Sequence, residues 1–287
     1  MPESKVGLFI PTLNAEKVLP DTLAIIDAAD DLLYRKLVID SESTDGTREL
    51  VKAHGFEVDT ISKQVFTHGK VRHWASDKLA DCDFIIMMTQ DVKLTTNAIR
   101  NLIRFIERYP NMLVAYGRQR VDMHKGSIFE YKARLFNYPE ASLVKTKSDI
   151  PELGIMTAFS SDVFSIYRQT KLRALGNFPD NINFAEDNYM AATGILKGLE
   201  VGYCADAEVL HTHHYTVSGE YHRYIAIGKF HRQNPWIQAS FGRNESAGVR
   251  SVFSEYGFLI KKGYWYLIPY STIRFGAKFL GYKRGQH

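Results

Sequence analysis

The stretch IIMMTQDVKL, residues 85–94, runs from apolar residues directly into a polar turn that carries one carboxylate, Asp91. Consecutive apolar residues bounded by turn residues predict a buried strand. In open α/β sheets, ligands bind beyond the carboxyl ends of the strands. We therefore expect Asp91 to be a site residue that the end of a rigid strand holds in place.

Strand and helix patterns alternate on both sides of this stretch. Apolar runs typical of strands lie at residues 5–14, 36–40, 56–61, 83–89 and 111–119, and helical periodicity lies between them at residues 15–29, 43–55, 70–80 and 96–109. This alternation predicts an α/β fold with a mostly parallel central sheet, wound by right-handed crossovers and flanked by helices. The polar segments 12–16, 40–45 and 89–91 follow three of these strands and should converge on one cleft.

Two local features carry expectations of their own. Ser43 or Thr44 is suited to cap the second helix, which should end at Gly55. Residues 138–157 have weak periodicity and two prolines, which predicts a long loop of the kind that serves as a lid.

The C-terminal quarter differs in composition from the rest of the chain. The 287 residues carry a net charge of +4, yet no acidic residue follows Glu255. We expect an α/β domain over residues 1–215 and a helical, basic and aromatic region over residues 216–287. That region suits an anionic membrane surface, packing against the catalytic domain, or a contact between copies in a homo-oligomer.

The sequence lacks the motifs that identify several other classes of protein. The two cysteines lie far apart and form no metal knuckle. The glycine-rich dinucleotide fingerprint, the P-loop and the nucleophile elbow are absent, as are the signatures of nucleic-acid-binding modules, so we expect no nucleic acid partner. The sequence shows neither a signal-peptide pattern nor a run long and apolar enough to span a bilayer, which predicts a cytoplasmic protein, peripheral at the inner face of the membrane if its tail binds lipid.

Two carboxylates stand at strand ends. Asp40 ends the second strand, where it could accept a hydrogen bond from the N3–H of uracil or thymine, or cap a turn. Asp91 would repel a diphosphate unless a divalent cation lay between them, and Mg²⁺ or Mn²⁺ suits such oxygen ligands. The alternative for Asp91 is an ordinary acid in the turn before the next helix.

Basic and acidic groups at two helix starts are further candidates. His68, Gly69 and Arg72 suit phosphate binding at a helix start, or are ordinary charges of a solvated helix end. Glu186 and Asp187 begin a later helix, where acids favour the helix dipole. An Asp at this position can also act as the general base for an acceptor hydroxyl.

A histidine cluster follows the last strand-like run. His211 and His213 alternate and should point to one face, with His214 next in the chain. Histidine is a common metal ligand, so one of these side chains could complete the coordination of a cation held by Asp91.

Four segments in order resemble the landmarks of family 2 glycosyltransferases with the GT-A fold. They are FIPTLNAEKVLPDTL (9–23), VIDSESTDGT (38–47), MTQDVKL (88–94) and FAEDNYMAATGILKG (184–198). In detail they are most similar to bacterial rhamnosyltransferases, as are FTHGKVR (66–72), AYGRQ (115–119), SSDVFSIYR (160–168) and VLHTHHY (209–215). The resemblance implies that residues 1–215 form a Rossmann-like GT-A domain that binds a nucleotide sugar and catalyses an inverting transfer from it.

The resemblance also implies roles for single residues. It places Asp40 at the nucleobase, Asp91 at the last acid of the metal-binding Asp-x-Asp, and Asp187 at the catalytic base with Glu186 beside it. The donor would be dTDP-β-L-rhamnose, and the acceptor a lipid-linked saccharide at the inner face of the membrane. The alternatives are a glycosyltransferase for another UDP or dTDP sugar, and a non-catalytic nucleotide- or glycan-binding module with the GT-A fold. Residues expected to contact the nucleotide sugar are Pro11, Thr12, Asn14, Asp40, Ser41, His68, Gly69, Arg72, Gln90 and Arg118; those expected at the metal are Asp91, His211 and His213.

Two departures from the family pattern affect these roles. Asp40 is followed by Ser41 where the family usually has a second Asp, which changes part of the nucleoside contact. The Asp-x-Asp is Thr89-Gln90-Asp91, so one carboxylate is missing and a histidine ligand becomes more important.

Overall fold

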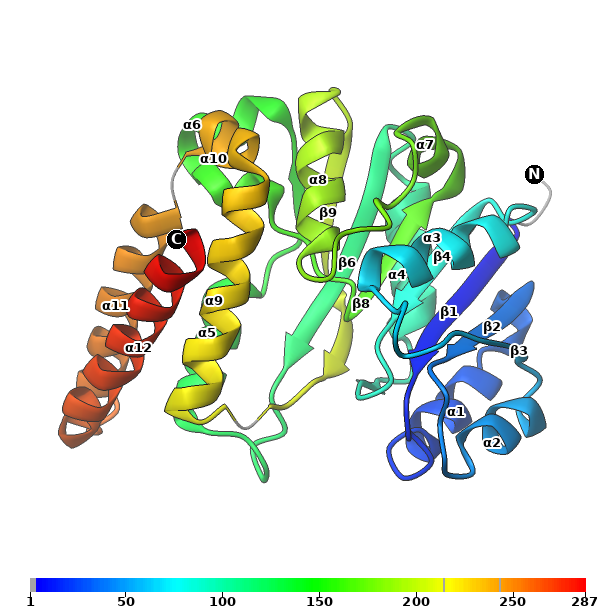
Figure 1. The fold of residues 1–287 in the computed structure, drawn as a ribbon, viewed down its shortest axis with the longest axis horizontal. Coiled ribbons are helices and arrows are strands. Elements are labelled where there is room, and N and C mark those ends of the chain that lie inside the picture. Colours follow the sequence, from blue (N-terminus) through cyan, green and yellow to red (C-terminus); the bar gives the residue numbers. More distant parts are fainter. Residues whose placement is uncertain (1–3, 214, 243) are drawn as a thin grey trace. The chain divides into compact units, whose positions relative to one another are not determined.

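A computed structural model describes residues 4–213, 215–242 and 244–287, which form two compact units. The first unit comprises Met1–Gln119, Glu140–Lys147 and Phe159–His211, and the second Arg120–Pro139, Ser148–Ala158 and Thr212–His287. Figure 1 follows the chain through both units. Two segments from the middle of the sequence thus belong with the C-terminal region.

The first unit is built on one mixed sheet. Its strands are β1 (Val6–Thr12), β2 (Arg35–Asp40), β3 (Glu57–Thr60), β4 (Phe84–Met88), β5 (Lys93–Leu94), β6 (Met112–Arg120), β7 (Leu143–Lys145), β8 (Phe164–Arg168) and β9 (Glu200–Leu210). Over the described residues their order is β3-β2-β1-β4-β8-β6-β9-β5, and β7 pairs with β9.

The direction of the strands explains how the sequence pattern relates to this sheet. Strands β1 to β4 pair in parallel, as predicted. Strand β8 inserts between β4 and β6 and runs antiparallel to both. Strand β6 therefore points the same way as β4 without pairing with it. The alternation of strands and helices predicted the directions of β1 to β4 and of β6 correctly. The sheet is nevertheless mixed, because β8 pairs antiparallel with β4, and β7 and β5 both pair antiparallel with β9.

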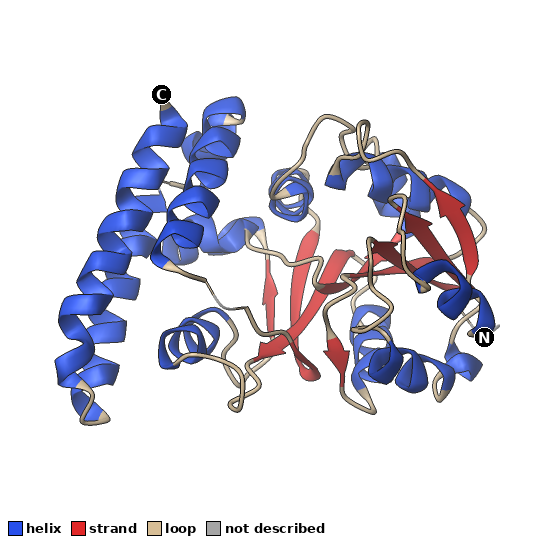
Figure 2. Ribbon diagram, turned by 60° about the horizontal axis from the view of Figure 1, so that its bottom comes forward, coloured by secondary structure: helices blue, strands red, loops and turns tan. Residues whose placement is uncertain are grey.

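Helices lie on both faces of this sheet (Figure 2). They are α1 (Pro20–Asp27), α2 (Thr47–Ala53), α3 (His68–Lys78), α4 (Ala98–Glu107), α7 (Gln169–Ala174) and α8 (Glu186–Leu196), with a short 3₁₀ turn at Asp30–Leu32. Leu8 and Ile10 of β1 share one core cluster with α1 and α4. Alternate side chains of a strand point to opposite faces, so Phe9 faces the other layer.

Two local predictions need correction. Helix α2 begins at Thr47 and its N-cap residue is Gly46, which has no side chain to cap it, while Ser43 bonds to Asp40. The segment 138–157 is not a structureless loop, since it contains β7, a turn at Lys147–Asp149, helix α6 (Ile150–Leu153) and a 3₁₀ segment at Gly154–Ala158.

The second unit is helical. Its elements are α5 (Ile128–Asn137), α6, α9 (Val217–Gln233), α10 (Pro235–Phe241), α11 (Asn244–Lys261), a 3₁₀ turn at Trp265–Leu267 and α12 (Ile268–Gln286). Helices α9 and α12 lie side by side (Figure 1). A Cβ at Gly281 would collide with the carbonyl oxygen of Tyr221, and one at Gly285 with that of Ile225. Glycine at these points therefore lets the two backbones touch.

Candidate active site

The loops that follow β1, β2 and β4 are tied together by hydrogen bonds. The Leu13 N–H donates to Gln90 Oε1 at 2.7 Å, and Gln90 Nε2 donates to the Leu13 carbonyl at 3.1 Å. The Asn14 N–H donates to Ser43 Oγ at 2.8 Å, and the Thr44 N–H donates to Asn14 Oδ1 at 2.9 Å. The structure thus brings together the three segments that the sequence places at the carboxyl ends of parallel strands.

Asp40 lies at the centre of this loop cluster and has no solvent-exposed surface. Its Oδ2 accepts from Thr12 Oγ1 at 2.8 Å, and its Oδ1 accepts from the Ser43 N–H at 2.8 Å. Ser41 is buried beside it, with its N–H on the Thr12 carbonyl at 2.8 Å. The carboxylate therefore fixes the shape of the loop, and direct contact between Asp40 and a nucleobase stays a prediction.

Asp91 and His211 form the core of a candidate metal site. His211 Nε2 lies 3.4 Å from Asp91 Oδ2. On the other side of the ring, Nδ1 is 2.9 Å from Gln119 Oε1, and Gln119 Nε2 donates to Ser161 Oγ at 2.7 Å. With its amide held in this orientation, Gln119 Oε1 accepts a hydrogen bond from the Nδ1–H of His211, which leaves the lone pair of a neutral His211 on Nε2, toward Asp91.

This geometry suits a cation. A lone pair facing a carboxylate is unfavourable unless the ring is protonated or a metal ion binds both atoms. Adjacent ligands around an ion with bonds of about 2.1 Å lie about 3 Å apart, close to the observed separation. A second hydrogen bond that fixes the tautomer of a metal-binding histidine is typical of such sites. Among the described residues, Asp91 and His211 therefore fit a divalent ion.

His213, the next histidine of the cluster that follows β9, belongs to the second unit. His213 lies two residues after His211 in the chain, and its N–H donates to Glu130 Oε1 at 2.7 Å. Its proximity along the chain keeps it a candidate ligand. His214 lies outside the described residues.

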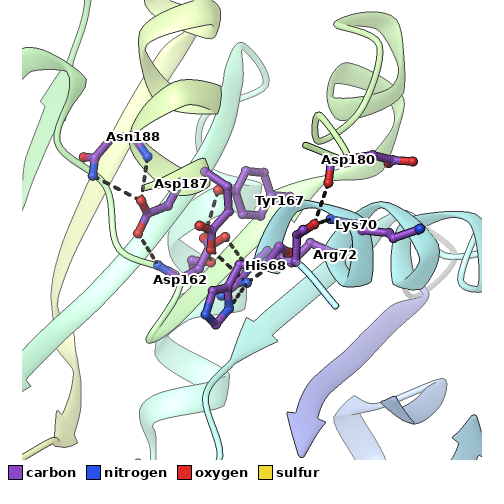
Figure 3. A network of polar contacts seen from close by, with 11 residues as sticks. His68, Lys70, Arg72, Asp162, Tyr167, Asp180, Asp187 and Asn188 are labelled. Carbon is purple, nitrogen blue, oxygen red and sulfur yellow. Dashed lines mark hydrogen bonds and ion pairs between the residues drawn. The ribbon is translucent and has the colours of Figure 1, made fainter. Parts of the chain in front are cut away.

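A buried charge cluster surrounds the start of α8 (Figure 3). Arg72 Nε lies 2.9 Å from Asp162 Oδ2, and Arg72 Nη1 lies 2.8 Å from Glu186 Oε1. Asp162 Oδ1 also accepts from Tyr167 Oη at 2.9 Å. Burial lowers the pKa of Arg72, but Glu186, Asp162 and Asp187 raise it by more. Arg72 is 3% exposed and its guanidinium pairs with carboxylates, so a contact between Arg72 and phosphate stays a prediction.

Asp187 lies at the edge of this cluster and is half-buried. Its Oδ2 accepts from the Asp162 N–H at 3.1 Å, and its Oδ1 accepts from the Asn188 N–H at 2.7 Å. Burial, together with the charges of Glu186 and Asp162, raises the pKa of Asp187 to about 8. A carboxyl group in this range is suited to take a proton from a hydroxyl near neutral pH.

The backbone immediately before Glu186 is strained. Ala185 has a φ of 61°, in the left-handed region that favours glycine. Strained non-glycine residues persist only where surrounding contacts hold them, and they gather at functional sites. Here the strain directs the first turn of α8, and so both acids, toward Arg72 and Asp162.

The base and the metal site are connected through neighbouring residues. The Thr89 N–H donates to the Val163 carbonyl at 3.2 Å, and the next residue back, Asp162, donates its N–H to Asp187. The segment that carries Asp91 and the residue that positions Asp187 are therefore adjacent at the same edge of the sheet. Asp91 follows β4 and Asp187 lies in the first turn of α8, and their segments meet at this edge of the sheet, which also holds Asp40 at the end of β2.

The other residues expected to contact the nucleotide sugar lie in different environments. His68 is the first residue of α3, and burial and Arg72 lower its pKa to about 4, so its ring is neutral. A Cβ at Gly69 would collide with the carbonyl oxygen of Pro179, so this glycine permits the chain to approach closely. Arg118 Nη1 pairs with Glu208 at 3.2 Å. Pro11 lies in β1, half-buried.

Sequence reasoning assigned no role to Asp162, Tyr167 or Gln119. Asp162 and Tyr167 lie in SSDVFSIYR, one of the segments that resembles the family, and Gln119 ends another. A polar residue directly before a strand was the available signal for Asp162. Its partners, however, come from α3 and α8, more than twenty residues away, so only the fold reveals the cluster.

Comparison with known proteins identifies the family of this chain. The family model "Glycosyl transferase family 2" matches residues 8–176. The chain belongs to glycosyl transferase family 2. Relatives of this chain include the O-antigen chain rhamnosyltransferase RfbN of Salmonella typhimurium, 40% identical over 99% of this chain and 90% of the relative. Another is WbaN of Salmonella anatum, 40% identical over 88% of this chain and 79% of the relative.

Solved structures confirm the GT-A type of fold in this family 2 member. TarS 1–349 of S. aureus has a TM-score of 0.59 and 15% identity, over 98% of this chain and 90% of that one. The mannosyltransferase PcManGT of Pyrobaculum calidifontis, in complex with GDP-Man and Mn²⁺, has a TM-score of 0.61 and 14% identity, over 97% and 87%. The family match and the two rhamnosyltransferase relatives show that the activity of the chain is glycosyl transfer.

Proposed function

We propose that this glycosyltransferase moves L-rhamnose from dTDP-β-L-rhamnose to a hydroxyl of a lipid-linked glycan, in bacterial surface polysaccharide synthesis and with inversion at the anomeric carbon. The observation that carries the proposal is the 40% identity to an O-antigen chain rhamnosyltransferase over 99% of this chain. The arrangement of Asp187, Asp91 and His211 supports the same chemistry.

In the proposed mechanism Asp187 is the general base. Its carboxylate removes the proton from the acceptor hydroxyl, whose oxygen attacks the anomeric carbon while the bond to the diphosphate breaks on the opposite face. Asp162 and Asn188 hold the carboxylate through backbone N–H groups, which fixes its direction of approach. Glu186 and Asp162 hold Arg72 beside it and keep the pKa of the base high.

We assign Mg²⁺ or Mn²⁺ to Asp91 and His211, with His213 as the third ligand. The fit rests on the Asp91–His211 distance and on the tautomer that Gln119 imposes. When bound, such a cation neutralises negative charge on the departing diphosphate. With one carboxylate in place of two, the His211 ligand contributes a larger share of the affinity than in a site of two acids.

A donor and acceptor panel tests the proposal. The purified chain is incubated with dTDP-rhamnose, UDP-glucose, UDP-galactose or UDP-N-acetylglucosamine and with short lipid-linked saccharides, and products are identified by mass spectrometry. A mass increase of one deoxyhexose with dTDP-rhamnose alone supports the proposal. Transfer from a UDP sugar only would assign another donor, and binding of nucleotide sugars with no transfer to any acceptor would indicate a non-catalytic module.

The proposed acceptor is a reason to expect contact between this protein and a membrane. A saccharide carried on a lipid is presented at a bilayer surface, and the basic C-terminal region has the charge for contact with anionic lipid. We therefore propose peripheral association with the inner face of the membrane.

A further inference from the structure

The turn between α11 and α12 exposes an unusual set of side chains. Residues 261–266, KKGYWY, are all exposed, with Trp265 at 67% and Tyr266 at 59%. Water-exposed tryptophan is costly, and Trp and Tyr beside lysine are typical of membrane–water interfaces, where the rings meet the headgroup layer.

Apolar stripes extend from this turn along both helices. On α11, Val249, Phe253 and Ile260 are 55%, 71% and 60% exposed, and their spacing of four and seven places them on one face. On α12, Ile273 and Leu280 are 60% and 62% exposed, seven residues apart. Exposed apolar residues in such continuous arrays indicate a binding surface rather than scattered exposure.

The charge of this hairpin, residues 249–284, identifies what could cover it. No acidic residue follows Glu255, which is itself buried and accepts a hydrogen bond from Ser271. Exposed Arg250, Lys261 and Lys262 therefore give the hairpin a positive surface. A second copy would bring like charges together, whereas anionic lipid headgroups would complement them.

The hairpin is firmly held within its own unit. Glycines at the α9–α12 contact bring the two backbones together, and Arg274 of α12 pairs with Glu220 of α9. Among the described residues, no helix has the length and apolarity needed to cross a bilayer. The hairpin is therefore a rigid element suited to lie on a membrane rather than to pass through it.

We propose that the α11–α12 hairpin docks on anionic lipid, with Trp265 and Tyr266 in the headgroup layer and Lys261 and Lys262 at lipid phosphates. This surface specifies the peripheral association proposed above, and it is independent of the identity of the donor sugar.

Vesicle co-sedimentation of the full chain tests the docking surface. Binding to vesicles of equal parts phosphatidylglycerol and phosphatidylcholine should exceed binding to pure phosphatidylcholine and should weaken as salt increases. The double variant Trp265→Ala, Tyr266→Ala and the double variant Lys261→Glu, Lys262→Glu should each lower affinity about tenfold or more. Equal binding to both vesicle types, or no loss in either variant, would overturn the proposal.

A matched control separates local recognition from net charge. Lys52→Glu with Lys197→Glu makes the same change in charge at exposed positions of the first unit, and should change vesicle affinity less than about twofold. An equal loss in this control would overturn docking through the hairpin. A wild-type dimer in analytical ultracentrifugation that Trp265→Ala, Tyr266→Ala dissociates would instead assign the surface to a second copy.

A second assay distinguishes a failure of the docking proposal from a failure of the proposed function. Transfer to a saccharide on a short, water-soluble carrier should be unchanged in the hairpin variants. Lost vesicle binding with retained transfer supports the docking surface. Absent transfer in the wild-type chain, with lipid binding intact, would overturn the rhamnosyltransferase proposal and leave the hairpin proposal standing.

Discussion

Each unit of the protein buries an arginine among carboxylates, but the charges balance in only one of them. In the second unit, Arg274 pairs with Glu220, while Lys278 Nζ lies 3.5 Å from Glu220 and Arg274 Nη1 lies 3.9 Å from Glu255. Two cations thus face two acids. A balanced and buried cluster of this kind can persist with every member ionised.

The cluster of the first unit has an excess of acids. Arg72 is the cation that faces Asp162, Glu186 and Asp187. One guanidinium cannot neutralise three carboxylates in a buried setting, so the cluster retains a proton, which the raised pKa of Asp187 expresses. The difference indicates that the balanced cluster maintains the helical unit, whereas the unbalanced one prepares a general base.

Removal of the base should have the largest effect. Asp187→Asn should lower the rate constant of transfer about a thousandfold, because general-base catalysis typically contributes two to four orders of magnitude. Donor binding, measured by calorimetry, should stay within about twofold, since the amide keeps the size of the carboxyl group. Asp180→Asn, on an exposed acid that pairs with His73, is the matched control. Wild-type turnover in Asp187→Asn would exclude this residue as the base.

Removal of each arginine compares the two clusters directly. Arg72→Met and Arg274→Met should each destabilise the protein by about 3 kcal/mol, because each leaves buried carboxylates without their main partner. Only Arg72→Met should also raise the pH at which transfer becomes half-maximal, since it removes the positive charge that opposes protonation of Asp187. Urea unfolding and pH–rate profiles provide the two measurements. A shifted profile in Arg274→Met would contradict the division of roles.

The metal site should depend on a residue that does not bind the ion. Gln119→Leu removes the acceptor that fixes the tautomer of His211, so Mn²⁺ affinity should fall about ten- to hundredfold. Asp91→Ala should abolish Mn²⁺ binding, and Glu208→Gln, on the half-buried partner of Arg118, should leave it unchanged. Affinity can be measured by electron paramagnetic resonance of free Mn²⁺. Unaltered Mn²⁺ affinity in both Asp91→Ala and Gln119→Leu would show that the ion binds to other residues.

The pH dependence of activity reports the protonation of Asp187. Its pKa near 8 means that kcat/KM should rise with pH and reach half its maximum near pH 8, because the base must be ionised. Glu186→Gln removes a neighbouring negative charge and should shift this midpoint down by about one unit. A profile that is flat between pH 6 and about 9 would contradict the assigned base.

The same group predicts an opposite trend for stability. A pKa raised from 3.8 to about 8 means that the folded chain binds more protons than the unfolded chain between these values. The contribution of Asp187 to stability is therefore complete below about pH 4 and is lost as the pH rises through 8. Asp187→Asn should gain stability relative to wild type as the pH increases from 6 to about 9, as followed by urea unfolding.

The strands and the loops at their carboxyl ends were predictable, because local periodicity and turn residues specify them. Helix α2 follows its strand as expected, and Asp40, Asp91 and Asp187 occupy strand and helix ends as the pattern requires. The insertion of β8 between β4 and β6 was not predictable, since pairing depends on contacts distant in sequence. For the same reason, the partners of Arg72 were not visible, and a residue expected at a phosphate proved to be buried among acids.

The pH dependence of stability that comes from buried lysines is the smallest effect that tests the comparison between the two clusters. Burial lowers the pKa of Lys145 to about 7, and its Nζ donates to the Phe159 carbonyl. Because the unfolded chain retains its proton up to about pH 10.5, this residue makes stability rise between pH 7 and 10.5, which is the reverse of the trend from Asp187. Lys145→Met should flatten that rise.

Lys278 of the balanced cluster supplies the matched control. Burial also lowers its pKa, but the charge of Glu220 opposes this effect, whereas at Lys145 burial acts alone. Urea unfolding of Lys145→Met and Lys278→Met at pH 7 and about 9.5 should therefore show the larger loss of pH dependence in Lys145→Met. Equal slopes in the two variants would mean that the second cluster does not hold its cations charged, and that the contrast between the two units is not one of charge balance.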